Sequence, residues 1–345
     1  MLMRPWLGQT IQNTRTSQLL RRSIVVARTV GEMRELQAVS AGPWRQGAAV
    51  GFVPTMGALH SGHISLVSAA KKSQDSAVVA SIFVNPTQFG QGEDLEKYPR
   101  TFERDLAMLS DAGVAYVFAP SANEMYGGAQ GPPLCHVEPL AFGSISEGQA
   151  RPNFFRGVAT VVSKLFNIVQ PTTAYFGQKD IAQCVLIRRM VKDLNFPVDI
   201  RVCETKREAD GLAMSSRNQY LLPSQRPQAA VLYRALSAAR EVAEAGGSPT
   251  PSSSSSSSPK PLTSKPVSRE TIIAAATAIL QREPLVSEIE YISIASTYDM
   301  REVLAVEAGG GEQGVVISAA IRLGGLGGVR LIDNVLVGKA SNYFY

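Results

Sequence analysis

The sequence predicts an α/β protein built on a doubly wound parallel sheet, with a second, smaller α+β domain towards the C-terminus. Residues 48–53 and 77–84 are near-continuous apolar runs, which are typical of strands buried on both faces of a sheet. Helical apolar patterns separate such runs, and this alternation favours parallel pairing. Residues 290–295, 315–322 and 330–332 are predicted strands of a small second sheet, with glycine-rich turns beside them.

The other elements continue this alternation. We expect strands at 23–27, 116–119, 174–176 and 198–203, and helices at 31–40, 64–72, 101–112, 155–169, 185–194, 271–281 and in a segment ending near 244. Pro54 is expected to end the strand at 48–53.

The chain is expected to divide into a leader at 1–22, a main domain at 23–205 and a C-terminal domain at 206–345. A Ser/Pro-rich insert at 246–268, with seven consecutive serines at 252–258, interrupts the C-terminal domain. Such a composition cannot bury an apolar core, so the insert is predicted to be disordered.

Composition and charge exclude several classes of protein. The chain is 45% hydrophobic and 18% charged and has no run of eighteen apolar residues, so no membrane span is expected. Three cysteines in 345 residues do not make a disulfide framework, which favours a reducing, cytoplasmic location. The net charge of +5 equals the contribution of five arginines in residues 1–31, which contain no acid. The remaining chain is therefore neutral and has no footprint for nucleic acid. The leader is either a mitochondrial transit peptide, which gives a mitochondrial alternative, or a disordered extension, or the product of an upstream start codon that is not used.

The segment Met56, Gly57, Ala58, Leu59, His60, Ser61, Gly62, His63 joins the first buried strand to a helix. His60 and His63 are three residues apart, so their rings share one helix face. The first N–H groups of a helix are unpaired and attract anions, which predicts a phosphate site. A zinc site is the alternative, but the only further histidine is His136, and zinc needs three or four protein ligands.

Polar side chains follow the later strands. Asn85 and Gln88 come directly after the run at 77–84. The carboxyl ends of parallel strands meet at one edge of a sheet, so both are expected beside the histidines. Asp105, in the next helix, is a candidate for magnesium, because carboxylates near phosphate often bind this ion. A solvated helix face is the alternative for Asp105.

Two later segments supply groups for an anion. Gly177, Gln178, Lys179 and Asp180 end a strand before the next helix, and Lys179 places a cation beside unpaired N–H groups. Met214, Ser215, Ser216 and Arg217 place two hydroxyls and a guanidinium in a loop, and these groups can bind phosphate oxygens.

Seven motifs occur in the order PTMGALHSGH, FVNPTQFG, EDLEKYPRT, RP-x-x-F-x-GV, GQKD-x-x-Q, ADGLAMSSRN and RLIDN. In this order the chain resembles the pantothenate synthetase (pantoate–β-alanine ligase) family, whose His-x-Gly-His element is shared by a superfamily of nucleotidyltransferases. The resemblance covers about residues 23–240 and 286–337. It is specific because seven motifs in a fixed order are far less expected by chance than any one of them.

The resemblance implies a Rossmann-like domain with a smaller lid domain, usually as a homodimer. It implies that pantoate and β-alanine are joined with ATP and Mg²⁺, through a bound pantoyl-adenylate. The implied ATP-binding residues are 56–63, 177–180, Lys206 and 214–217, and the implied catalytic residues are His60, His63, Lys179 and Arg217, with His63 as the candidate proton donor. Gln88 and Gln183 are implied to hold pantoate, with Asn85 and Arg151 beside them, Arg151 also near the phosphates, and Asp105 at the magnesium end.

The chain departs from the family pattern at two places. Residues 153–155 are Asn-Phe-Phe where relatives often have Gly-His-Phe, and Gln178 stands where they often have glutamate. Two other functions remain open. A different nucleotidyltransferase would not need Gln88 and Gln183 together, and a non-catalytic relative would be expected to lack His63, Lys179 or the two serines.

Overall fold

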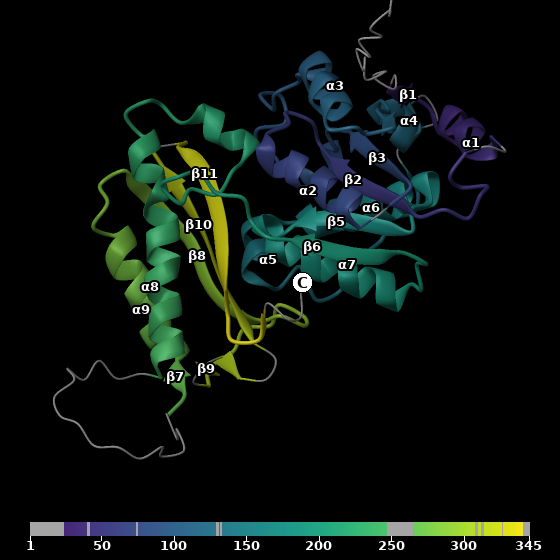
Figure 1. The fold of residues 1–345 in the computed structure, drawn as a ribbon. Coiled ribbons are helices and arrows are strands. Elements are labelled where there is room, and N and C mark those ends of the chain that lie inside the picture. Colours follow the sequence, from purple (N-terminus) through teal and green to yellow (C-terminus); the bar gives the residue numbers. More distant parts are fainter. Residues whose placement is uncertain are drawn as a thin grey trace, which may run out of the picture.

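A six-stranded sheet, parallel throughout, forms the centre of the N-terminal part of the molecule (Figure 1). Its strands in spatial order are β1 (Val25–Ala27), β4 (Tyr116–Phe118), β3 (Ala77–Ile82), β2 (Val50–Thr55), β5 (Thr173–Gly177) and β6 (Asp199–Cys203). From β2 the strand order runs through β3 and β4 on one side, whereas β5 and β6 lie on the other side. The strand order therefore reverses between β2 and β5. Ligands of such sheets bind outside the carboxyl ends of the strands at this point.

Helices cover both faces of this sheet because both faces of its strands are apolar. Phe52 and Val79 join the apolar cluster of α6 (Phe154–Val169) and α7 (Ile181–Asp193). Val53 and Ala80, one residue further along each strand, join the cluster of α2 (Ser61–Lys72) and α3 (Phe102–Asp111). The helices of this part are α1 (Val30–Ala38), α2 (Ser61–Lys72), α3 (Phe102–Asp111), α4 (Ala122–Tyr126), α5 (Ser146–Ala150), α6 (Phe154–Val169) and α7 (Ile181–Asp193), with the 3-10 turns η1 (Pro86–Gln88) and η3 (Gln178–Asp180). The predicted doubly wound fold is confirmed.

The C-terminal part is a separate antiparallel sheet in the order β11 (Val329–Val337), β10 (Val315–Leu323), β8 (Val286–Ser296). One face of this sheet packs on α8 (Val231–Ala245) and α9 (Arg269–Leu280). The apolar side chains of the sheet and of these two helices form their own cluster. Ala295 and Val316 instead belong to the cluster of α6 and α7. The sheet therefore lies between its own helices and the parallel-sheet domain, as Figure 1 shows.

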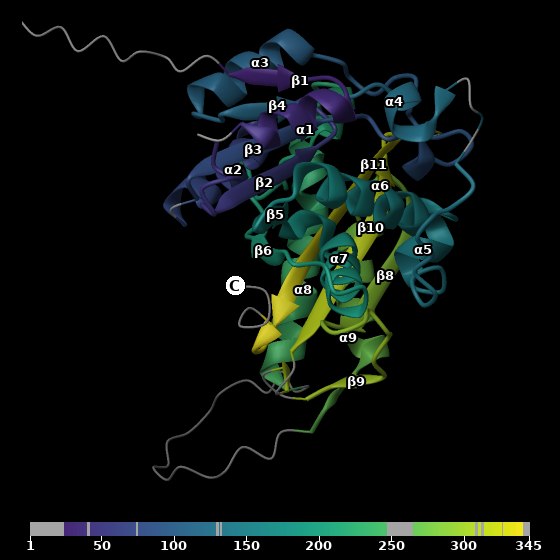
Figure 2. The same cartoon turned by 90° about the vertical axis from the view of Figure 1, so that its right-hand side faces the viewer.

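The remaining elements are small. They are the 3-10 turns η4 (Ser216–Tyr220) and η5 (Arg226–Ala230) and a two-stranded pair of β7 (Val267–Ser268) and β9 (Ala305–Val306). Both views place α3 and β9 at opposite ends of the molecule (Figures 1 and 2).

Several predicted boundaries are wrong. The first long strand continues through Pro54 to Thr55. Its pairing with β5 covers only Gly51 and Phe52, so Pro54 has a single neighbouring strand, where the missing N–H is tolerated. The predicted insert ends too late, because Val267–Ser268 form β7 and the Ser268 side chain accepts a bond from Thr271 N as the N-cap of α9. The strand expected at 330–332 continues to Val337.

The structure describes residues 24–39, 42–73, 75–128, 131, 133–246, 265–307, 310–311, 314–325 and 327–340. The predicted leader and residues 247–264 of the predicted insert lie outside these ranges. Within them, no helix is both long and apolar enough to cross a membrane.

We propose that the boundary between the two domains lies near residue 205. Two features support this place: the last parallel strand, β6, ends at Cys203, and α8 belongs to the apolar cluster of the second sheet.

Candidate active site

A cavity of about 1070 Å³ opens at the carboxyl ends of the parallel strands and extends to β11 of the second sheet. Most of the residues predicted from the sequence line it, namely Met56, His60, Gly62, His63, Asn85, Gln88, Arg151, Gly177, Lys179, Asp180, Gln183, Lys206, Met214, Ser215, Ser216 and Arg217. Gly57, Ala58, Leu59, Ser61, Asp105 and Gln178 are not part of its wall.

The two histidines sit at the start of α2. His60 is the N-cap residue, and its Nδ1 accepts a hydrogen bond of 3.1 Å from the backbone N–H of Gly62. The Nδ1 of His63 accepts one of 3.4 Å from the backbone N–H of His60, and the ring centroids are 4.1 Å apart. Because Nδ1 of each ring accepts, each neutral ring carries its proton on Nε2. The pair therefore presents two N–H donors beside a helix N-terminus.

Both rings are neutral at neutral pH. Burial, with a smaller contribution from the charge of Lys179, lowers the pKa of His60 to about 4. Burial also lowers the pKa of His63 to about 3, with smaller contributions from His60 and Lys179. In the free protein His63 can donate a hydrogen bond from Nε2, but it carries no additional proton to transfer.

Acidification is expected to destabilise the fold through these rings. The unfolded chain protonates histidine below about pH 6.5, whereas the folded rings stay neutral to about pH 4 and about pH 3. The unfolded state therefore binds more protons in this window, and the free energy of unfolding falls as the pH falls. Protonation of each histidine in the unfolded chain limits its share of the fall in unfolding free energy to about 2 kcal/mol between about pH 7.5 and about pH 5. Urea unfolding at both pH values should show a smaller fall for His60→Gln/His63→Gln than for the unsubstituted protein; equal falls would contradict the expectation.

Lys179 lies in the turn between β5 and α7. Its Nζ is 3.7 Å from Asp180 Oδ1, and its side chain faces the cavity. The Gln178 side chain does not face the cavity: its buried amide donates to Asn334 Oδ1 at 2.9 Å. Asn334 in turn donates to the carbonyls of Gln178 and Lys179, at 2.9 and 3.0 Å. The sequence reasoning missed this role of Asn334, although the residue ends the RLIDN motif.

The segment 214–217 packs on the histidine loop. The Ser216 hydroxyl donates to the carbonyl of Ala58 at 3.0 Å, and the Ser61 hydroxyl contacts Met214 Sδ at 2.8 Å. The Met214 N–H donates to the carbonyl of Lys206 at 2.9 Å. Segments distant in sequence thus form one wall.

Arg217 is not a free cation in this wall. Its Nε and Nη2 donate to the two carboxylate oxygens of Asp94, at 2.9 and 2.8 Å. A phosphate would have to compete with Asp94, a partner that sequence reasoning missed because the two residues are far apart in the chain.

Asn85 and Gln88 have different roles. The Asn85 amide donates to Gln88 Oε1 at 3.0 Å and to the carbonyl of Gly157 at 3.2 Å. Its Oδ1 accepts from the Tyr126 hydroxyl at 2.6 Å and from Thr87. With its side chain fully engaged and only 1% exposed, Asn85 orients Gln88 and is not itself available to a substrate. The Gln88 amide, 3.2 Å from Met56 Sδ, faces the cavity.

Arg151 is also engaged by protein groups. Its Nε and Nη2 donate to Glu93 at 2.8 and 2.6 Å, and its Nη1 lies 3.6 Å from Glu147 Oε1. Two carboxylates thus neutralise the arginine that the resemblance placed near the phosphates.

Asp105 does not fit a magnesium ligand. Its side chain is 1% exposed, and its Oδ2 and Oδ1 accept the backbone N–H groups of Ala58 and Leu59 at 2.9 and 2.8 Å. Thr101 Oγ1 adds a bond to Oδ1 at 3.1 Å. Across the described ranges, no three His, Cys, Asp or Glu side chains are grouped to hold a metal ion. Asp105 instead fixes the loop before α2.

Comparison with known proteins gives one consistent result. The sequence model of the Pantoate-beta-alanine ligase family matches residues 25–336. A pantothenate synthetase of Chloroflexus aggregans is 48% identical over 288 residues, which are 84% of this chain and 93% of that protein. The crystal structure of the Thermus thermophilus enzyme matches with a TM-score of 0.74 and 41% identity, over 90% of this chain and 99% of that one.

A further solved structure carries ligands. The pantoate-β-alanine ligase of Francisella tularensis, complexed with beta-gamma ATP and β-alanine, matches with a TM-score of 0.66 and 30% identity, over 91% of this chain and 97% of that one. A match across nearly the whole chain, in sequence and in fold, shows that this chain belongs to the pantoate–β-alanine ligase family.

Proposed function

We propose that this chain condenses pantoate with β-alanine to pantothenate, using ATP and releasing AMP and pyrophosphate. The observation that carries the proposal is the convergence in one cavity of His60, His63 and Lys179 with Gln88 and Gln183. The first three are donors for phosphate, and the two amides suit an acid that also bears hydroxyls. The relatives named above support the same activity.

The reaction needs no enzyme nucleophile. A pantoate carboxylate oxygen attacks the α-phosphorus of ATP, pyrophosphate leaves, and the acyl-adenylate forms. The β-alanine amine then attacks the acyl carbon, loses a proton, and AMP departs. In the first step the main need is stabilisation of negative charge on the phosphates, which we assign to the Nε2–H groups of His60 and His63 and to Lys179.

We assign the nucleotide to the wall formed by 56–63, 177–180, Lys206 and 214–217, and pantoate to the side of Gln88 and Gln183. Gly57, Ala58, Leu59, Ser61 and Gln178 belong to these segments but do not line the cavity, so we assign them a supporting role through the backbone and through packing. Arg217 would bind phosphate by leaving Asp94. Magnesium is proposed to accompany the phosphates of ATP and not to bind Asp105.

Two further proposals concern the protein as a whole. We propose a homodimer, supported by Leu134 and Leu140, whose side chains are 98% and 93% exposed in the single chain. We also propose a cytoplasmic location, which the three unpaired cysteines suit. The mitochondrial alternative draws no support from the family match, which starts at residue 25.

The experiment that tests the proposed function is exchange of radiolabelled pyrophosphate into ATP, with and without pantoate. Exchange that requires pantoate, and formation of pantothenate and AMP when β-alanine is added, is the expected result. Lactate serves as the control acid. Normal ATP binding with no exchange, or exchange with lactate instead, would refute the proposal and favour a different nucleotidyltransferase.

A further inference from the structure

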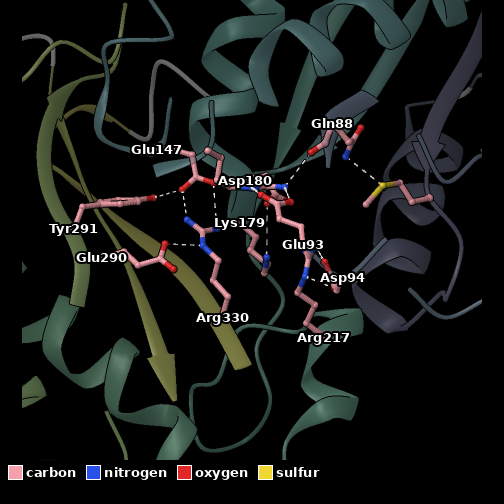
Figure 3. A network of polar contacts seen from close by, with 12 residues as sticks. Gln88, Glu93, Asp94, Glu147, Lys179, Asp180, Arg217, Glu290, Tyr291 and Arg330 are labelled. Atoms are coloured by element: carbon pink, nitrogen blue, oxygen red, sulfur yellow. Dashed lines mark hydrogen bonds and ion pairs between the residues drawn. The ribbon is translucent and has the colours of Figure 1, made fainter. Parts of the chain in front are cut away.

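A chain of alternating charges joins the two domains beside the cavity (Figure 3). Its centre is Glu147 on α5, which is 6% exposed. Arg330 of β11 donates to both of its oxygens, from Nη1 at 3.2 Å and from Nη2 at 2.8 Å. The Tyr291 hydroxyl of β8 adds a bond of 2.8 Å, and Arg330 Nε donates to Glu290 at 2.7 Å. The second sheet therefore holds Glu147 by three hydrogen bonds.

The other side of Glu147 faces Arg151, which follows α5 directly. The guanidinium of Arg151 lies between Glu147 and Glu93, and its Nη2 also donates to the backbone carbonyl of Gln88 at 3.1 Å. Its Cζ is 3.8 Å from the ring centroid of Phe154. Arg151 therefore has one position, set by the two carboxylates and the ring, and from it holds the backbone of Gln88.

Removal of charge from Glu147 would disturb this arrangement from both sides. Glu290 would then be the one carboxylate paired with Arg330, and Glu93 the one paired with Arg151, among the described residues, while both guanidinium groups stay largely buried. A buried charge that loses a partner moves or draws in water. Glu147 itself is not part of the cavity wall, whereas Arg151 and Gln88 are. An effect of Glu147 on a substrate must therefore pass through a partner in the wall, which is Arg151 on the side of Gln88 and Arg330 on the side of the second sheet.

We propose that Glu147 is a positioning residue for the pantoate side of the cavity, where it couples the docked second sheet to Arg151 and thereby to Gln88. The inference rests on the proposed function, which assigns pantoate to Gln88. The nucleotide side is anchored by other contacts, such as those of Asn334 with 178–179 and of Ser216 with Ala58. Substitution of Glu147 should consequently weaken the binding of pantoate more than the binding of ATP.

The test is Glu147→Gln, which keeps the size of the side chain and removes its charge. In pantoate-dependent exchange we expect the KM for pantoate to rise about tenfold, because small displacements of binding groups have effects of this order. The KM for ATP should change by less than about twofold, since its wall does not depend on Arg151.

Glu302→Gln is the matched control. Glu302 accepts a hydrogen bond of 2.8 Å from Ser146 Oγ on the same helix α5 and pairs with Arg269, so it also links the two domains. It has no contact with Arg151 or Gln88 among the hydrogen bonds and ion pairs of the described residues. A variant that only loosens the docking of the domains should therefore resemble Glu302→Gln.

The outcomes separate the two proposals. A rise in the KM for pantoate in Glu147→Gln alone supports the positioning role. An unchanged KM for pantoate, or equal rises for both substrates in both variants, overturns it. If Glu147→Gln does not fold, Tyr291→Phe removes one bond to the same carboxylate, and a selective rise of about two- to threefold is then expected; no rise overturns the inference. Lack of pantoate-dependent exchange in the unsubstituted protein would instead refute the proposed function.

Discussion

His63→Ala is expected to lower the rate of pantoate-dependent ATP–pyrophosphate exchange by about 100-fold or more, because removal of one preorganised donor to a developing negative charge has this effect. The ring presents its Nε2–H at the start of α2, fixed by the bond of its Nδ1 to the backbone of His60. Alanine removes the donor and leaves water in its place. Steady-state exchange rates at saturating ATP and pantoate measure the loss.

His63→Gln separates the two roles that His63 could have. The glutamine amide nitrogen can occupy the place of Nε2 and donate a hydrogen bond, but it cannot transfer a proton at neutral pH. Because burial lowers the pKa of His63 to about 3, we expect His63→Gln to retain activity within about tenfold of the unsubstituted protein. Activity as low as that of His63→Ala would instead support the proton donor that the resemblance implies. His136→Ala is the control, since His136 is exposed and paired with Glu138 outside the cavity.

Local patterns predict the parts of the site that depend on neighbours in the chain. Strands β2 and β3 are apolar on both faces, so their burial is visible in the sequence. His60 and His63 are three residues apart at a strand–helix junction, and both rings do lie on the cavity wall. The family and the doubly wound fold are likewise confirmed.

Partners distant in the chain decide the rest. Arg217 and Asp94 are separated by 123 positions, and Gln178 and Asn334 by 156. No period of 3.6 or 2 residues relates such pairs, so a sequence reading finds the cation and misses the carboxylate that neutralises it. Arg151 and Glu93, 58 positions apart, are the same case, whereas the second partner of Arg151, Glu147, is only four residues away. Most of the candidate residues line one cavity, while their free or paired state depends on tertiary contacts.

Asp105 differs from these arginines, because the sequence itself contains a signal that its carboxylate is turned into the protein. It precedes Leu109 by four residues, so both occupy the same face of α3, and Leu109 is buried. A carboxylate on a buried helix face needs internal donors. The pattern thus indicated an acid turned into the protein, and the donors are the N–H groups of the loop before α2.

Asp105→Asn is expected to lower the free energy of unfolding by about 3 kcal/mol, the cost of leaving a buried N–H group and its surroundings unsatisfied. An amide has one oxygen, so either Ala58 or Leu59 would face an NH₂ group in place of an acceptor. The loop depends on this carboxylate because Ala58 has a φ of 50°, a left-handed conformation that a residue with a Cβ adopts only when it is held. Its release would also displace His60 and His63, so exchange should fall together with stability. Urea unfolding in the presence of EDTA measures the first effect without any contribution from a metal.

The same measurement distinguishes this role from magnesium binding. A metal ligand would leave the unfolding free energy in EDTA unchanged on substitution, and raised Mg²⁺ would restore part of the activity. Glu103→Gln is the matched control, since Glu103 is an exposed acid in the first turn of the same helix, and it should change neither quantity. We expect the loss of stability in Asp105→Asn to be the same with EDTA and with Mg²⁺, because both oxygens of Asp105 are already occupied by the loop that presents the histidines.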